Sequence, residues 1–210
     1  MMNIYNKKSY YQDYLDDLGV DLNNEFELTE HSLDIDCQKF YDFADAFKKE
    51  ALTKWYGPRP FYDFDSMRQA VFLNSLGYNE HNSFEYNWGI EQEHNDILKE
   101  LVGRHNFEQL NVDYDSVGIR LLQYNPGNGI PLHTDSFNAY KTQNGVGNIT
   151  RYFVAVSPWD WGHFLQVHDK MIHHWKPGYT LEIPDGVFHL SANFGIAPKL
   201  TLTITGFVNE

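Results

Sequence analysis

The stretch MIHHWKPGYTLEIPDGVFHLSAN, residues 171–193, decides the fold of this chain. It contains three short runs of strand-forming residues, separated by Lys176-Pro177-Gly178 and Pro184-Asp185-Gly186. Each separating triplet combines proline, which fixes φ, with glycine, which tolerates positive φ, and such combinations mark tight turns. The stretch therefore predicts three consecutive strands joined by turns, with no helix between them.

The same alternation of short strands and turns extends through the C-terminal half of the chain. Further turn signals are Asn125-Pro126-Gly127 and His168-Asp169-Lys170. The eight predicted strands lie at about 116–124, 130–134, 150–157, 163–167, 171–175, 179–183, 187–193 and 199–208. Because eight short strands without intervening helices are typical of a two-sheet jelly roll, the predicted class is α+β, mainly β. We expect a double-stranded β-helix (jelly roll) with N-terminal supporting helices.

A first supporting helix is indicated by apolar residues spaced alternately by four and three positions: Leu33, Cys37, Phe40, Ala44, Phe47 and Ala51. That spacing is the stripe of an amphipathic helix, for which Ser32 is the expected N-cap and Gly57-Pro58-Arg59-Pro60 the stop. Residues 1–30 are polar, acidic and rich in tyrosine, and they are expected to form an irregular arm.

Two more helices are predicted, at 66–76 and at about 90–102, which end at Gly77 and Gly103. The residues of the later helix expected to face inward are Ile90, Ile97, Leu98 and Leu101. The chain is thus expected to be one domain over 1–210, with a mostly helical support region at 1–114 and the β-helix core at 115–210.

Composition excludes several classes of protein. The formal net charge of −13 opposes binding to a phosphate backbone, which disfavours nucleic acid as a partner. Cys37 is the single cysteine, so an intramolecular disulfide and a thiolate cluster are excluded. The N-terminus lacks an apolar signal region, and no apolar stretch approaches membrane-spanning length, so a soluble, cytoplasmic protein without a membrane partner is expected.

The triplet His133-Thr134-Asp135 is a candidate metal-binding motif. Residues i and i+2 of a strand point the same way, so both side chains can reach one metal. With 10 histidines and 29 acidic residues in 210, a histidine two positions before an acidic residue is expected once or twice by chance. The second instance, His94 and Asp96, falls in a predicted helix, where positions i and i+2 point apart. His94 is therefore interpreted as a surface or packing histidine.

His189 is the candidate for a third ligand, because it begins a predicted strand near the far end of the barrel. Two histidines and one carboxylate are the protein ligands typical of non-haem Fe(II) oxygenases, which keep open positions opposite them. The alternative for His189 is an ordinary core histidine.

Residues 116–208 resemble the Fe(II)/2-oxoglutarate-dependent dioxygenases, and most closely the prolyl 4-hydroxylase type. A secondary likeness to aspartyl/asparaginyl hydroxylases covers Gly162 to His189. The resemblance implies that a basic residue about ten positions after the second histidine binds the far carboxylate of 2-oxoglutarate, and that residue is Lys199. The sequence departs from the resemblance in having Trp159-Asp160-Trp161-Gly162-His163 where many prolyl hydroxylases are glycine-rich.

Strand alternation places Lys199, Thr201 and Thr203 on one face. That face is either a solvent-facing polar side or an inward wall on which Lys199 and Thr201 bind a carboxylate. Tyr124 is either a third donor to the same carboxylate or an ordinary strand aromatic. Arg151 either contacts a ligand or, as we expect, lies on the surface.

The resemblance implies Fe(II) as cofactor, with 2-oxoglutarate and dioxygen as cosubstrates, and His133, Asp135 and His189 as metal-binding catalytic residues. The expected reaction is hydroxylation of a peptide side chain (prolyl or asparaginyl), a free amino acid or a small metabolite, with release of succinate and carbon dioxide. Phe137 to Asn148 is a candidate lid, and Trp159 and Trp161 are a candidate aromatic wall.

Two other functions use the same fold. One is a cupin-like metalloenzyme without 2-oxoglutarate, such as a sugar isomerase. Such sites recruit closely spaced histidines, whereas the adjacent His173 and His174 would face opposite ways on a strand. The other is a non-catalytic jelly-roll binding or structural module, which would take up no Fe(II) or Mn(II).

Overall fold

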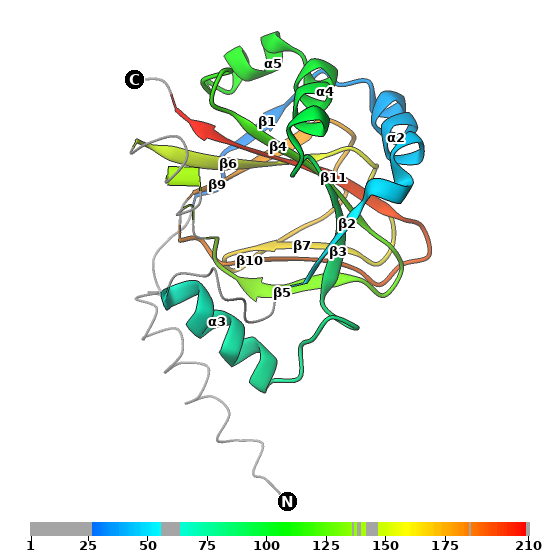
Figure 1. Ribbon diagram of the computed structural model, residues 1–210, viewed down its shortest axis with the longest axis vertical. Helices are drawn as coiled ribbons and strands as arrows, with labels where there is room; N and C mark the ends of the chain where they lie inside the picture. The colour runs from blue at the N-terminus through cyan, green and yellow to red at the C-terminus, as the bar shows by residue number, and fades with distance from the viewer. Residues whose placement is uncertain are drawn as a thin grey trace, which may run out of the picture.

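A computed structural model describes residues 27–55, 64–135, 137, 140–141, 147–184 and 186–208. It contains two antiparallel sheets that face one another (Figure 1). The larger has the strand order β1-β9-β6-β11-β4-β3-β2, and the smaller has the order β5-β10-β7-β8. The strands are β1 Glu30–Ser32, β2 Leu52–Trp55, β3 Phe84–Trp88, β4 Gly118–Tyr124, β5 Gly129–His133, β6 Ile149–Ala155, β7 His163–Val167, β8 Lys170–Ile172, β9 Tyr179–Pro184, β10 His189–Asn193 and β11 Lys199–Phe207.

The double-stranded β-helix expected from the sequence is present. Each of the eight predicted strands appears, as β4 to β11, although β8 ends at Ile172 and leaves the remainder of 171–175 outside the strand. The glycines of three predicted turns, Gly127, Gly178 and Gly186, all have positive φ, as tight turns of this kind require.

The region before residue 115 contributes strands as well as helices. The helices are α2 Cys37–Ala46, the 3₁₀ turn η2 Lys48–Glu50, α3 Phe64–Ser75, α4 Gln92–Val102 and α5 Arg104–Gln109. The short strands β1, β2 and β3 and the helix α5 were not predicted from the sequence. All three strands extend the larger sheet, and β3 pairs directly with β4 beside the barrel interior.

The helix termini correct two expectations and confirm a third. Asp36, and not Ser32, is the N-cap of α2, because Ser32 is held in β1 by pairing with Tyr179. Ile90 lies before α4 and is 48% exposed, so its predicted inward position is wrong. Gly77 ends α3 as predicted.

At that end, the amide of Gly77 donates to the carbonyl of Asn74, and the amide of Tyr78 donates to the carbonyl of Leu73. Those two bonds form a Schellman motif, in which the positive φ of Gly77 closes the helix. A further expectation, that the first helix runs on to Gly57–Pro60, is wrong: α2 ends at Ala46, because Leu52–Trp55 pairs with β3 as strand β2. Most of the arm expected at 1–30 lies outside the described residues.

The central strand β11 explains how one sheet can have an apolar outer face and a polar inner face. Its alternating pattern puts Leu200, Leu202 and Ile204 outward, where they are buried under α2, α4 and α5 (Figure 1). Lys199 and Thr201 point inward and are equally buried, so the solvent-facing alternative for this side is wrong. None of the described helices is long and apolar enough to cross a membrane.

Candidate metal centre

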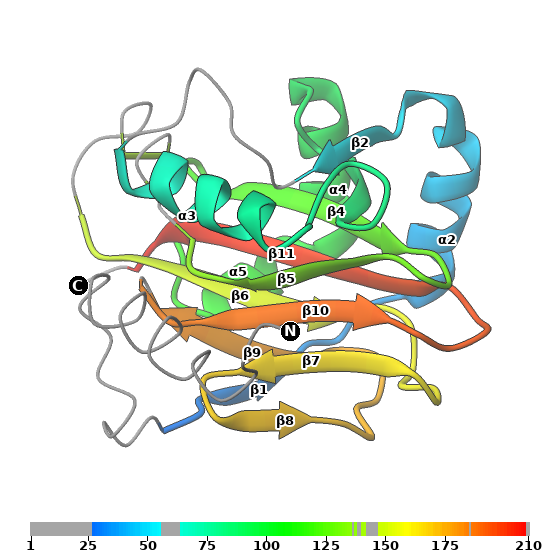
Figure 2. The ribbon, with the colours of Figure 1, turned by 90° about the horizontal axis from the view of Figure 1, so that it is seen from below.

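The pairing of β5 with β10 brings the two candidate histidine ligands together. His133 ends β5, His189 begins β10, and the two residues are direct partners in the antiparallel register. Their ring centroids are 4.4 Å apart, and both side chains are buried. Figure 2 shows β5 and β10 as neighbours along the smaller sheet.

A β-bulge in β5 turns His133 into the barrel. The register shifts between His189 and Ser191, so three steps from Ile130 to His133 match two steps on β10. As a result Ile130 and His133, an odd number of residues apart, both line the same pocket. Pro131 occupies the bulge, where a residue without an amide hydrogen is tolerated.

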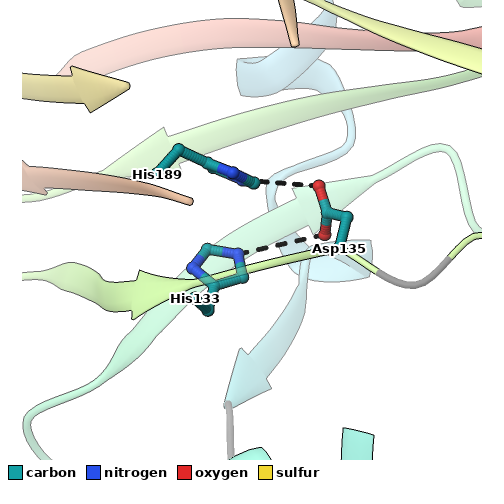
Figure 3. A group of neighbouring side chains, drawn as sticks. All are labelled: His133, Asp135 and His189. Atoms are coloured by element: carbon teal, nitrogen blue, oxygen red, sulfur yellow. Dashed lines mark ion pairs between the residues drawn. The ribbon is translucent and has the colours of Figure 1, made fainter. Parts of the chain in front are cut away.

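Asp135 completes a group of three possible metal ligands (Figure 3). One of its carboxylate oxygens lies 3.3 Å from Nε2 of His189, and the other lies 3.9 Å from Nε2 of His133. One ligand atom from each residue lies within 4.8 Å of the other two. Within the described parts of the chain, no other three His, Cys, Asp or Glu residues meet in this way.

Both histidines are oriented by hydrogen bonds that leave Nε2 for a metal. Nδ1 of His133 lies 2.7 Å from the carbonyl oxygen of Pro131, and Nδ1 of His189 lies 3.0 Å from that of Val187. A carbonyl oxygen only accepts, so each Nδ1 carries the hydrogen. In the neutral ring Nε2 then holds a lone pair, which is the arrangement usual for metal-binding histidines.

Asp135 is ionised at neutral pH. Burial by itself would raise the pKa of its carboxyl, but Arg151, His189 and His133 together hold that pKa well below its usual range. Arg151 forms an ion pair with Asp135, and its Nε donates to Oγ1 of Thr205 at 3.0 Å. The expectation of a surface arginine at Arg151 is therefore wrong, since the side chain points into the pocket.

The helix α3 holds the backbone between the two candidate ligands His133 and Asp135. Oε1 of Gln69 accepts from the amide of Thr134 at 3.0 Å, and Nε2 of Gln69 donates to the carbonyl of Thr134 at 3.1 Å. This double hydrogen bond fixes the direction in which the loop leaves β5. Nothing in the sequence around Gln69 suggested this role, because the partner is 65 residues away.

Lys199 begins β11 and is fully buried. Its Nζ donates to the carbonyl of Phe164 and to Oγ of Ser191, each at 2.6 Å. Burial lowers the pKa of Lys199 to about 7, and the charge of Glu85 opposes that shift. Ser191 is two residues from His189 on β10, or roughly 7 Å along a strand, so the lysine is within reach of a short ligand bound at the triad.

Two hydroxyl groups that line the pocket differ in their partners. Oγ1 of Thr201 is buried and has no hydrogen-bond partner among the described residues, which is unusual for a buried polar group. The hydroxyl of Tyr124 donates to Oε2 of Glu85 at 2.5 Å. Lys199, Thr201 and Tyr124, the residues expected to bind a carboxylate, thus come together on neighbouring strands.

Sequence reasoning missed Glu85 and Asn87, which line the pocket from β3. The sequence does contain a signal for this strand, since Phe84-Glu85-Tyr86-Asn87-Trp88 alternates strictly between aromatic and polar residues. Both polar residues are buried on the inner face.

The other candidate residues lie away from the pocket. His94 is a packing histidine, as expected: it is buried against Phe43 and Phe47, and its Nε2 lies 3.0 Å from Oε2 of Glu50. In the part of the chain that the structure describes, neither Trp159 nor Trp161 lines the pocket. The expected lid at 137–148 falls largely outside the described residues.

Comparison with known proteins supports the fold. No known protein family and no curated protein sequence matches this chain significantly. Among solved structures, it is similar to the non-heme alpha-ketoglutarate-dependent epimerase SnoN from nogalamycin biosynthesis, with a TM-score of 0.56 and 10% identity over 86% of this chain and 78% of that one. It is also similar to a Pseudomonas putida prolyl-4-hydroxylase, with a TM-score of 0.51 and 12% identity over 93% and 98% of the two chains. The chain is a double-stranded β-helix protein with a candidate His-Asp-His metal site.

Replacing Gln69 by leucine should weaken metal binding about 10- to 100-fold, because the loop that carries Asp135 loses both of its hydrogen bonds to α3. The affinity is measured by titration with Mn(II), in which the electron paramagnetic resonance signal reports the concentration of the free ion. Gln92→Leu, on an exposed turn of α4, is the control and should bind Mn(II) as the unsubstituted protein does. Unchanged affinity in Gln69→Leu would show that the loop needs no support from α3.

Proposed function

We propose that this protein is an Fe(II)- and 2-oxoglutarate-dependent dioxygenase. The observation that supports it best is one pocket lined both by the triad His133, Asp135 and His189 and by Ser191, whose hydroxyl contacts the buried Nζ of Lys199. A buried ammonium group beside a threonine hydroxyl that has no partner in the described part of the chain suits a ligand carboxylate. Two histidines and one carboxylate suit Fe(II).

Each of these residues has a defined part in the proposal. His133, Asp135 and His189 hold Fe(II) through their Nε2 and carboxylate oxygen atoms. Lys199 uses the N–H that is not engaged with Phe164 or Ser191 to bind the distal carboxylate of 2-oxoglutarate, and Thr201 donates its hydroxyl to the same group. Bound Fe(II) and 2-oxoglutarate together supply the oxidising chemistry, in which dioxygen is consumed and succinate and carbon dioxide are released.

The proposed primary substrate is a peptide side chain (prolyl or asparaginyl), a free amino acid or a small metabolite. The net charge of −13 argues against nucleic acid as the substrate. The apolar side chains that line the pocket, among them Leu122, Phe153 and Leu165, limit the access of water to the triad.

Anaerobic titration with Fe(II) and then with 2-oxoglutarate tests the proposal directly. A weak visible charge-transfer band should appear when the cosubstrate chelates the metal, and succinate should accumulate after air is admitted. If Fe(II) binds but neither the band nor succinate is observed, a cupin-like metalloenzyme without 2-oxoglutarate accounts better for the site. If the protein takes up no metal, a non-catalytic jelly-roll module does.

Replacing Lys199 by methionine should weaken binding of 2-oxoglutarate at least about 100-fold, because the buried site loses its cation while the volume stays filled. Calorimetry on the Mn(II)-loaded protein measures this loss, and the affinity for Mn(II) itself should stay within about twofold. Lys176→Met, at an exposed turn, is the control. An equal loss of metal and cosubstrate binding in Lys199→Met would indicate that the lysine only supports the fold.

A further inference from the structure

Glu85 is a buried carboxylate that lines the pocket. It lies on β3 with 3% of its surface exposed. Oε2 accepts the hydroxyl of Tyr124 at 2.5 Å, and Oε1 accepts the side-chain amide of Asn87 at 3.3 Å. Tyr124 is also the register partner of Lys199, whose Nζ lies 5.1 Å from the centre of the tyrosine ring. Glu85 and Lys199 therefore flank the same aromatic side chain with opposite charges.

The position of Glu85 is costly for the fold. Among the described residues it forms no ion pair within 4.0 Å, although burial of a carboxylate without a direct counter-ion is unfavourable. A glutamine would have the same shape and could still accept the hydrogen bond from Tyr124. What distinguishes glutamate here is its negative charge, which acts on the neighbourhood of Lys199.

We propose that Glu85 is an internal competitor of the cosubstrate: its carboxylate takes the Tyr124 hydroxyl and balances Lys199, and so opposes the entry of a ligand carboxylate. This inference rests on the proposed function, because it assumes that Lys199 receives the distal carboxylate of 2-oxoglutarate. A second carboxylate beside Lys199 would be repelled by the negative charge of Glu85 inside the protein, where such repulsion is strong. Glu85 thereby sets the affinity of the pocket for a dicarboxylic 2-oxo acid.

The charge of Glu85 is tested with two ligands that share the chelating end. 2-Oxoglutarate carries a distal carboxylate, and 2-oxopentanoate has a methyl group in its place. Binding of each to the Mn(II)-loaded protein is measured by anaerobic calorimetry at about pH 6.5, below the pKa of about 7 of Lys199, so that the lysine is mainly charged. The test variant is Glu85→Gln. The matched control is Glu182→Gln on the outer side of β9, where the carboxylate of Glu182 accepts a hydrogen bond from Thr150.

In Glu85→Gln, 2-oxoglutarate should bind about tenfold tighter, whereas 2-oxopentanoate should change by less than about twofold. In Glu182→Gln neither affinity should change. This gain in affinity must exceed an opposing effect. Loss of the negative charge of Glu85 also makes Lys199 harder to protonate, which reduces the fraction of charged lysine. Equal or weaker binding of 2-oxoglutarate by Glu85→Gln would overturn the inference and leave Glu85 as a support for Lys199.

If Glu85→Gln does not fold, the comparison of ligands on the unsubstituted protein decides. An advantage of 2-oxoglutarate over 2-oxopentanoate below about 30-fold supports an opposing charge, and any larger advantage overturns it, since an unopposed buried lysine strongly favours the carboxylate. If all of the proteins bind Mn(II) but none of them binds either 2-oxo acid, the proposed function fails and this inference fails with it. Binding of both acids with an unchanged preference in Glu85→Gln overturns only the role of Glu85.

Discussion

The pairing of β5 with β10 is the constraint on which the candidate site depends. It places His133 directly opposite His189, although the two residues are 56 positions apart in the chain. The bulge at Pro131 then turns His133 inward, and the hydrogen bonds from Gln69 to Thr134 direct the loop so that Asp135 faces both rings. A shift of one residue in this register would move His133 to the outside of the barrel and separate the three side chains.

The second requirement is a sheet with different chemistry on its two faces. Leu200, Leu202 and Ile204 of β11 anchor the larger sheet to the helices, and this apolar contact stabilises the barrel from outside. The inner face can then carry polar groups at a cost in stability that the outer core offsets. Glu85, Lys199 and the hydroxyl of Thr201, which has no partner among the described residues, lie on that inner face. Buried polar and charged groups that destabilise a fold are common where a ligand binds.

Local signals explain how much of this could be predicted from the sequence. The eight core strands follow from proline–glycine turns and alternation, and His94 could be set aside because helical geometry separates it from Asp96. Features that depend on distant partners could not be predicted: the N-cap at Asp36, the double hydrogen bond of Gln69 and the ion pair of Arg151. The alternation in Phe84–Trp88 could have indicated the strand β3, but not that its polar residues face the barrel interior, which reverses the usual polar-outward pattern.

A crystal structure with Mn(II) and 2-oxoglutarate would decide whether the triad and Lys199 bind one ligand together. We expect anomalous density for one metal ion bound by Nε2 of His133, Nε2 of His189 and the carboxylate of Asp135. We also expect the distal carboxylate of the ligand to lie about 3 Å from Nζ of Lys199. A metal bound elsewhere, or a ligand whose distal carboxylate points away from Lys199, would contradict this expectation.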